Sequence, residues 1–403
     1  MKSYADLPAR LLKATSLRGA SPSAAPFDAS AITETIQRAL SAAGLNTQAG
    51  PMRGVTDTIH QALSAAGLMQ RIAPIAHGAT FDGVARQIDA SPDVTDSTPT
   101  EPIAPAKPAR PGEFVSRSFT NSAGTRTYKL YVPESYSAEP HDAVPLLVML
   151  HGCTQSPDDF AVGTRMNELA EQYGFLVAYP AQAVDANGAR CWNWFRSEDQ
   201  SRDVGEPALI AGITREVASS YRVDERRIFV AGMSAGAAMA VVLGATYPDL
   251  YAAVGAHSGL AYRAAYDMAS AVGAMHGGDI PKTLDPRQSK NAVPTIVFHG
   301  DRDYTVNARN GRAIVAQTIA GRSDQPNLRT SVNEGAAPGG GTFTRTVVAD
   351  AADQPVVEQW VLHGVGHAWS GGSPNGSFTH ADGPDASAEM IRFFYSQLRA
   401  GTA

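Results

Sequence analysis

Residues 227–243 read RIFVAGMSAGAAMAVVL, an apolar run that leads into a serine between glycines and then into a run of small residues. This order predicts a buried strand, a sharp turn and a helix, with Ser234 on the turn. Gly232-Met233-Ser234-Ala235-Gly236 has the pattern G-x-S-x-G, in which glycines keep side chains out of a crowded turn. We therefore expect Ser234 to be an exposed nucleophile beside the N-terminus of the following helix, which favours the charge that develops on attack.

An acid and a histidine follow the serine in chain order, each on a loop after a predicted strand. The run 293–298 leads to Asp303, and the run 356–362 leads to His367. The order serine, acid, histidine is that of the α/β-hydrolase fold. We expect a neutral His367 to accept the proton of Ser234, and the carboxylate to fix the tautomer of the imidazole.

Two acids and two histidines compete for these roles. Asp303 lies farther into its loop than Asp301, which directly follows the strand and is expected to bond local backbone. His367 follows Gly366, which indicates a loop folded closely over a pocket, whereas His363 ends its strand and is interpreted as structural. The sequence favours Asp303 and His367, and geometry must decide. Three further histidines follow apolar runs and are interpreted as strand-end residues bonded to backbone: His151, His257 and His299.

An oxyanion hole requires two backbone N–H donors. The residue after the nucleophile, Ala235, is expected to provide one. The loop after the predicted strand Val144–Leu150 is expected to provide the other, and Cys153 is the natural donor because Gly152 lets the backbone approach the substrate closely. An ordinary glycine turn is the alternative interpretation of this loop.

Four motifs together resemble the poly(3-hydroxybutyrate) depolymerase-like esterases: LHGCTQ at 150–155, RCWNWF at 190–195, AGMSAGAAM at 231–239 and GHAWSGG at 366–372. The resemblance covers residues 113–400. It implies an α/β-hydrolase fold, hydrolysis of acyl esters, a triad of Ser234, Asp303 and His367, and Cys153 at the oxyanion hole. This chain has Ser370 where the last motif usually carries proline, a departure that we expect to affect only the rim of the pocket.

The resemblance also implies a disulfide bond between Cys153 and Cys191, the two cysteines of the chain. Without this resemblance, the expectation for two cysteines in a chain of this length is that they are more often free and buried. Neither a cysteine pair nor a histidine cluster has the spacing of metal ligands, so we expect no metal and no other cofactor.

Composition and charge favour a soluble protein. The chain has 403 residues, 43% hydrophobic and 18% charged, and a net charge of -6 without basic clusters, so nucleic acid and anionic membranes are not expected partners. No apolar stretch has the length of a membrane span. The first ten residues show no secretory signal, which favours the cytoplasm, whereas a disulfide-bonded polyester hydrolase suits export. Both locations stay open.

The first 90 residues are expected to form a helical extension. Residues 35–45 recur as residues 58–68, each a short amphipathic helix that ends at a glycine. Two such units are too small for a core of their own, so they are expected to dock on the catalytic domain, a second subunit or a polyester surface, with partial disorder as the alternative. Residues 91–112 are a proline-rich linker, and residues 113–403 alternate strands and helices around a mostly parallel central sheet.

The substrate is the least determined part of the prediction. Trp369, Trp194 and Asn193 are the candidate pocket residues, and segment 259–291 is a candidate cap. We expect a serine esterase that acts on poly(3-hydroxyalkanoate) or its oligomers, with a feruloyl, acetyl or other short-chain esterase as the alternative. A non-catalytic scaffold would show a damaged triad, and this triad is whole in the sequence.

Overall fold

The computed structural model of the chain describes residues 112–136, 143–277, 292–322 and 327–399. The predicted helical extension over residues 1–90 lies outside the described residues, as does nearly all of the predicted linker over residues 91–112.

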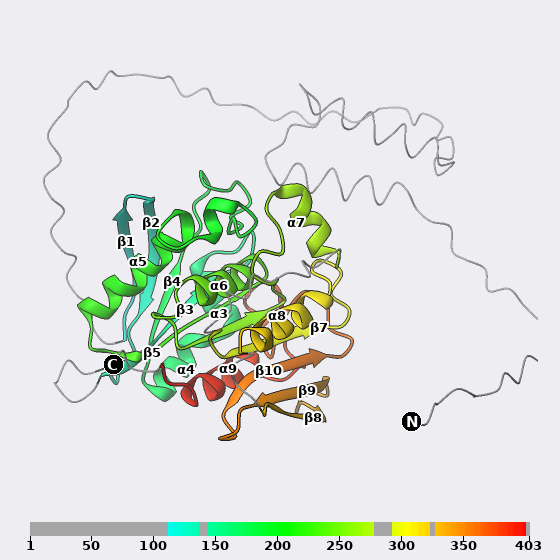
Figure 1. The fold of residues 1–403 in the computed structure, drawn as a ribbon. Coiled ribbons are helices and arrows are strands. Elements are labelled where there is room, and N and C mark those ends of the chain that lie inside the picture. The colour runs from blue at the N-terminus through cyan, green and yellow to red at the C-terminus, as the bar shows by residue number, and fades with distance from the viewer. Residues whose placement is uncertain (1–111, 137–142, 278–291, 323–326, 400–403) are drawn as a thin grey trace, which may run out of the picture. The chain divides into compact units, whose positions relative to one another are not determined.

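Ten strands form one sheet in the order β1-β2-β4-β3-β5-β6-β7-β10-β9-β8 (Figure 1). The central strands from β4 to β10 are parallel, and the two edges are antiparallel. The bounds are β1 Phe114–Asn121, β2 Gly124–Tyr131, β3 Val144–Leu150, β4 Leu176–Pro180, β5 Val223–Met233, β6 Ala253–His257, β7 Thr295–Gly300, β8 Arg329–Ala336, β9 Thr342–Ala349 and β10 Pro355–Leu362. A separate pair, β11 Trp369–Ser370 and β12 Thr379–His380, joins two loops.

The central strands are buried on both faces, because alternate side chains enter two different cores. In β3, Leu146, Val148 and Leu150 belong to one core, while Leu147 and Met149 belong to the other. This is the two-residue period of a strand, applied to a run with no polar position.

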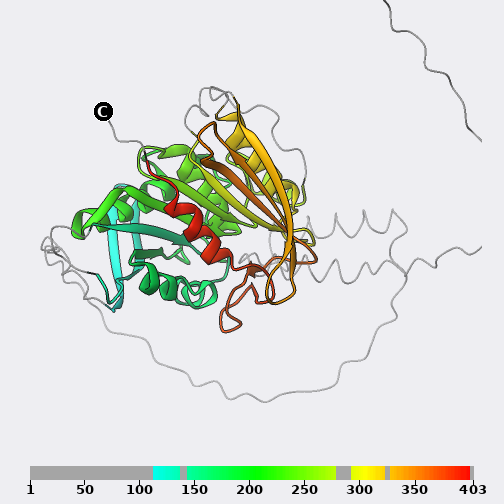
Figure 2. The ribbon, with the colours of Figure 1, turned by 90° about the horizontal axis from the view of Figure 1, so that it is seen from below.

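Helices cover both faces of the sheet, and Figure 2 shows the two groups on opposite sides of the strands. The first core receives side chains from α5 Gly205–Ser220, α6 Ala235–Thr246, α7 Met268–Met275 and α8 Arg309–Ala320. The second receives side chains from α3 Pro157–Thr164, α4 Met166–Tyr173 and α9 Ala386–Tyr395. A short 3-10 helix, η1 Ser197–Gln200, precedes α5.

Local signals explain where several helices begin and end. Helix α4 ends at Tyr173, because Gly174 adopts a φ of 68° and its N–H donates to Ala170 O. Helix α5 begins at Gly205, and Pro207 lies in its first turn, where a missing N–H costs no hydrogen bond. In the candidate cap, α7 is begun by a capping box at Asp267, and residues 278–291 lie outside the described residues.

Candidate active site

Ser234 lies on a strained turn between β5 and α6. Its backbone has a φ of 56° and a ψ of -121°, outside the regions that side-chain-bearing residues normally adopt. A Cβ added at Gly232 would lie 2.6 Å from the carbonyl oxygen of Leu150, and one added at Gly236 would lie 2.1 Å from the same oxygen. The steric reason for both glycines, predicted from the sequence, is therefore present in the structure.

Asp303 and His367 are joined by a hydrogen bond of 2.7 Å between Oδ2 of the acid and Nδ1 of the ring. The other carboxylate oxygen of Asp303 accepts the N–H groups of Thr305 at 3.0 Å and Val306 at 2.8 Å. The Asp303 side chain is fully buried, whereas that of His367 is 13% exposed. The acid is thus fixed by its own loop, and the histidine reaches solvent.

The surroundings of Asp303 favour its ionised form. Burial alone raises the pKa of this carboxyl, but hydrogen bonds from His299, His367 and the Val306 N–H outweigh burial and hold the pKa well below its usual range. Because an ionised carboxylate only accepts hydrogen bonds, Nδ1 of His367 carries the proton. Nε2 of His367 is then the basic nitrogen, available to a nucleophile.

The competing residues pair with each other. His363 Nδ1 lies 3.0 Å from Asp301 Oδ2, Gly364 N donates to the second oxygen of Asp301 at 2.7 Å, and Thr344 Oγ1 lies 2.9 Å from His363 Nε2. Both nitrogens of His363 are occupied, and its side chain is 40% exposed. This pair holds the loop after β10 at the surface, in line with the structural interpretation of His363. The carboxylate of Asp301 bonds that distant loop rather than the local backbone that was expected.

The strands that carry the three candidate residues end at one edge of the sheet, because β5, β6, β7 and β10 are parallel neighbours. The His367 ring is hydrogen-bonded to Asp303. Within the described residues, no hydrogen bond joins the His367 ring to the Ser234 hydroxyl. The structure therefore brings the acid and the base together, and the complete triad stays a prediction.

The loop after β3 passes beside the nucleophile: a Cβ added at Gly152 would lie 3.6 Å from that of Ser234. Gly152 N donates to Gln155 Oε1 at 2.9 Å, whereas the N–H groups of Cys153 and Ala235 have no acceptor within the described ranges. Two unengaged N–H groups near the serine are what an oxyanion hole requires. Their role in catalysis stays a prediction.

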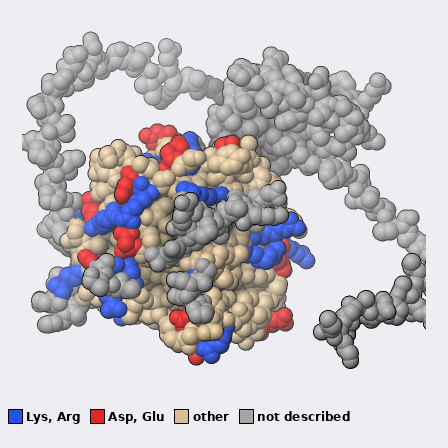
Figure 3. All heavy atoms as spheres, viewed as in Figure 1, with Lys and Arg blue, Asp and Glu red and all other residues tan. Residues whose placement is uncertain are grey.

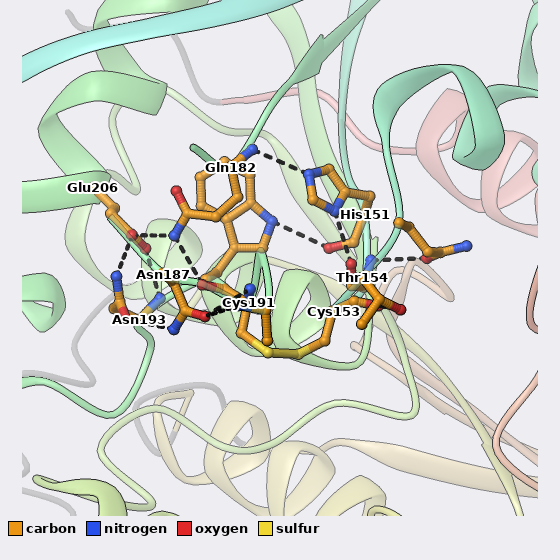
Figure 4. The surroundings of a disulfide bond; sticks show 12 residues. His151, Cys153, Thr154, Gln182, Asn187, Cys191, Asn193 and Glu206 are labelled. Carbon is orange, nitrogen blue, oxygen red and sulfur yellow. Dashed lines mark hydrogen bonds between the residues drawn. A yellow bond between two sulfur atoms is a disulfide. The ribbon is translucent and has the colours of Figure 1, made fainter. Parts of the chain in front are cut away.

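A disulfide bond joins Cys153 to Cys191, as the resemblance implies (Figure 4). It links the loop after β3 to the segment that carries the RCWNWF motif. Thr154 N also donates to Ala189 O at 2.7 Å, and Trp192 Nε1 donates to His151 O at 3.1 Å. The candidate oxyanion loop is therefore held by one covalent and two hydrogen-bonded contacts to a single segment.

The three strand-end histidines are buried and bonded, in line with their structural interpretation. His151 Nε2 accepts Gln182 N at 3.1 Å, and His299 Nε2 lies 2.7 Å from Val306 O. His257 Nε2 accepts Ser370 N at 3.1 Å, and burial lowers the pKa of His257 to about 3. Ser370 is itself fully buried. The departure from the family motif therefore lies in the core beside His257 rather than at the pocket rim.

The candidate pocket residues are packed more deeply than expected. Trp369 is 1% exposed, stacks on His257 and donates from Nε1 to Ser387 Oγ at 3.0 Å. This is a correction, because a ring that close to His367 was expected to face a pocket, and it faces the core instead. Trp194 is buried against Phe195, and Asn193 is buried against Glu206. Substrate contact by Trp194 and Asn193 stays a prediction.

Glu206 is a buried residue of the site that the sequence analysis missed. Its side chain lies to one side of the disulfide, bonded to Gln182 and Asn193 (Figure 4). An acid in the first turn of a helix is ordinarily explained by the helix dipole, so the sequence contained no signal that this one turns inward.

The chain is similar in sequence to a family of esterases. The sequence model of the family described as esterase PHB depolymerase matches residues 126–325. The resemblance is confirmed. Poly(3-hydroxyalkanoate) depolymerase C of Paucimonas lemoignei is 30% identical over 63% of this chain and 60% of its own length. A probable acetylxylan esterase A of Neosartorya fischeri is 29% identical over 47% of this chain and 54% of its own length. Feruloyl esterase B of Neurospora crassa is 32% identical over 38% of this chain and 50% of its own length.

The α/β-hydrolase fold class is confirmed. The structure of an acetyl xylan esterase from Aspergillus awamori superimposes with a TM-score of 0.53, 20% identity, and coverage of 70% of this chain and 99% of the other. The chain spans between half and three-fifths of the length of the three sequence relatives named above.

The charge distribution on the surface and the length of the helices concern the predicted absence of nucleic-acid and membrane partners. On the face in Figure 3, Lys and Arg side chains are interspersed with Asp and Glu rather than gathered in one basic area. Among the helices of the described ranges, none is both long and apolar enough to cross a bilayer.

Proposed function

We propose that the chain is a serine carboxylesterase that hydrolyses esters through an acyl-enzyme, with poly(3-hydroxyalkanoate) or its oligomers as substrate. The observation that carries the proposal is the hydrogen-bonded Asp303–His367 pair at the same sheet edge as a strained, glycine-flanked Ser234. The match of residues 126–325 to the family supports it.

Each step of the reaction uses a group of this site. His367 Nε2 takes the proton of Ser234 as the serine oxygen bonds to the ester carbonyl carbon. The N–H groups of Cys153 and Ala235 stabilise the resulting oxyanion. His367 then returns the proton to the leaving alcohol as the ester C–O bond breaks, and Asp303 stabilises the transient imidazolium. Water, deprotonated by the same imidazole, releases the acid and restores the serine.

The substrate class rests on the relatives. The depolymerase from Paucimonas lemoignei favours a polyester, and the acetylxylan and feruloyl esterases favour a small acyl group on a plant polysaccharide as the second candidate. The exposed side chain of Tyr304, next to Asp303 in the sequence, offers apolar surface for an acyl chain.

A panel of esters separates these functions. One purified sample is assayed on p-nitrophenyl esters of increasing chain length, a feruloyl ester, acetylated xylan and emulsified poly(3-hydroxybutyrate), with Ser234→Ala as the control. Soluble hydroxyacids released from the polyester, and lost in Ser234→Ala, are the expected result. Hydrolysis of acetylated xylan or the feruloyl ester alone would move the substrate to the second candidate. A Ser234→Ala variant with wild-type rates would contradict the mechanism.

The disulfide bond supports an exported location. Bonds of this kind persist in oxidising environments and are reduced in most cytosols, so we place the protein in an exported pool. Trapping free thiols in cells before lysis tests this: two alkylated cysteines on most of the chains would return the protein to the cytosol.

A further inference from the structure

Glu206 is a buried carboxylate surrounded by hydrogen-bond donors. It is the second residue of α5, and its side chain is 4% exposed. Asn193 N donates to its Oε2 at 2.7 Å, Asn193 Nδ2 donates to its Oε1 at 2.7 Å, and Gln182 Nε2 donates to the same Oε1. Arg126 Nη2 lies 3.6 Å from that oxygen. An ionised carboxylate accepts all of these contacts at once.

The partners of Glu206 reach the candidate oxyanion loop from two directions (Figure 4). Gln182 Nε2 also donates to Cys191 O at 2.8 Å, and Gln182 N donates to His151 Nε2 at 3.1 Å. His151 in turn contacts Gly152 O through Nδ1 at 2.8 Å. Gln182 therefore connects Glu206 to both ends of the disulfide-linked unit, to Cys191 through its side chain and to His151 through its backbone N–H.

Asn193 provides the second connection between Glu206 and the candidate oxyanion loop. Its Oδ1 accepts Asn187 Nδ2 at 3.0 Å, and Asn187 Oδ1 accepts the N–H groups of Ala189 at 3.0 Å and Cys191 at 3.3 Å. These hydrogen bonds fold segment 187–193 into a compact turn, and Asn193 bonds this turn to Glu206. The same turn holds the loop after β3 through the Cys153–Cys191 disulfide and the Thr154–Ala189 hydrogen bond.

The electrostatics of Glu206 indicate a function other than filling space. Burial raises the pKa of Glu206 to about 7, the nearby charge of Asp199 adds to this rise, and the hydrogen bonds from Gln182 and Asn193 and the charge of Arg126 oppose it. A buried charge contributes less to stability than an apolar side chain of similar volume. What the carboxylate provides is a fixed arrangement of acceptors that orients two amide side chains.

We propose that Glu206 is a positioning residue that sets the direction of the Cys153 N–H by holding segment 187–193 and Gln182 behind it. The inference rests on the proposed function, because it assigns the Cys153 N–H to the oxyanion. Glu206 itself touches no reacting atom and acts through Asn193, Gln182 and the disulfide.

The test compares Glu206→Gln with a matched variant of another buried carboxylate, Glu358→Gln. Glu358 is fully buried on β10 and is paired with Arg345 and Arg392, away from the loop after β3. Both variants replace an oxygen acceptor by an NH₂ group that faces donors. The measurements are kcat and KM on a soluble p-nitrophenyl ester at about pH 8, where Glu206 is ionised, the midpoint of thermal unfolding, and the rate at which dithiothreitol reduces the disulfide of the folded protein.

We expect Glu206→Gln to lower kcat by about tenfold or more with KM within about twofold, because an oxyanion contact acts in the transition state. We also expect it to speed the reduction of the native disulfide severalfold. Glu358→Gln should lower the unfolding midpoint and leave both rates near those of the wild-type protein. Should Glu206→Gln fail to fold, Gln182→Met breaks the same connection with little change in volume and should show the same pattern to a smaller degree.

Wild-type values of kcat and of the disulfide reduction rate in Glu206→Gln, or equal losses of kcat in the two glutamate variants, would overturn the proposal. Absence of esterase activity in the wild-type protein would instead contradict the proposed function. The reduction assay would then decide by itself whether Glu206 holds this segment.

Discussion

Asp301 and Asp303 each contact a histidine, yet their surroundings give them different chemistry. Asp303 is buried and bonded by two N–H groups of its own loop, whereas Asp301 is exposed and bonds the surface residue His363. We predict that Asp303→Asn lowers kcat/KM by about 10⁴, because the wrong tautomer of His367 is then favoured.

Asp301→Asn is the matched control and should leave kcat/KM within about threefold of the wild-type value, since an exposed ion pair contributes little. Both are measured on one soluble ester. A large loss in Asp301→Asn with a small one in Asp303→Asn would transfer the acid role to Asp301 and the base role to His363.

The carboxyl of Glu206 predicts a pH dependence of stability. Its folded-state pKa of about 7 exceeds the value of 4.5 that a free glutamate has. Between these values the folded protein holds a proton that the unfolded chain has released, so the free energy of unfolding falls as the pH rises. We predict that urea unfolding of the wild-type protein shows this decline relative to Glu206→Gln between about pH 4.5 and 7. Parallel curves for the two proteins would contradict the raised pKa.

On the scale of secondary-structure elements, the glycines of the turn between β5 and α6 are tightly constrained. A Cβ at Gly236 would lie 2.1 Å from Leu150 O and 2.5 Å from His151 O, so the strand-turn-helix unit has to move. We predict that Gly236→Ala lowers stability by about 3 kcal/mol or more and kcat/KM by at least about 100-fold.

Gly273 in α7 is the control, because a Cβ there would have no neighbour within 4 Å. Gly273→Ala should raise the unfolding midpoint slightly, as expected for alanine in a helix, and leave the rate unchanged. Thermal unfolding and kcat/KM of the two variants decide the matter. A fully active Gly236→Ala variant would show that the turn is more adaptable than its contacts indicate.

The elements that sequence could predict are those with strong local signals. The apolar run of β3 and the capping glycine of α4 determine their bounds without tertiary information. The polar strand β8 has no such signal, because seven of its eight residues are exposed and only pairing with β9 makes it a strand. In the site, loop position correctly favoured the Asp303–His367 contact. Whether Trp369 and Glu206 face the solvent or the core depends on packing between distant segments, which spacing along the chain does not encode.

On the scale of the whole molecule, the disulfide connects two loops that are 38 residues apart in sequence. Closing a loop of this length stabilises a folded protein by about 4 kcal/mol in the chain-entropy description. We predict that the double variant Cys153→Ser, Cys191→Ser unfolds at a lower temperature than the wild-type protein and has a lower kcat on a soluble ester. Two free thiols in the unreduced, denatured wild-type protein would contradict the bond itself.

The placement of the catalytic groups and of the repeats in different parts of the chain leads to a further prediction. All candidate catalytic groups lie after residue 112, so a chain that begins at Gly112 should keep the wild-type kcat on a soluble short-chain ester. We predict that it loses binding to insoluble polyester or changes its oligomeric state, because the repeats at 35–45 and 58–68 are expected to dock on a surface or a second subunit. The measurements are pull-down on polyester granules and size-exclusion chromatography with light scattering. A well-folded but inactive truncated protein would place residues before 112 in the site.

The contact between Ser370 N and His257 Nε2 links two positions that are 113 residues apart. A proline at 370, the residue usual in the family motif, has no N–H and would leave a buried, neutral imidazole nitrogen without a donor. The two positions are therefore epistatic: a proline at 370 is tolerated only with a different residue, or a different tautomer, at 257. Substitutions at the two positions are therefore expected to have non-additive effects on stability.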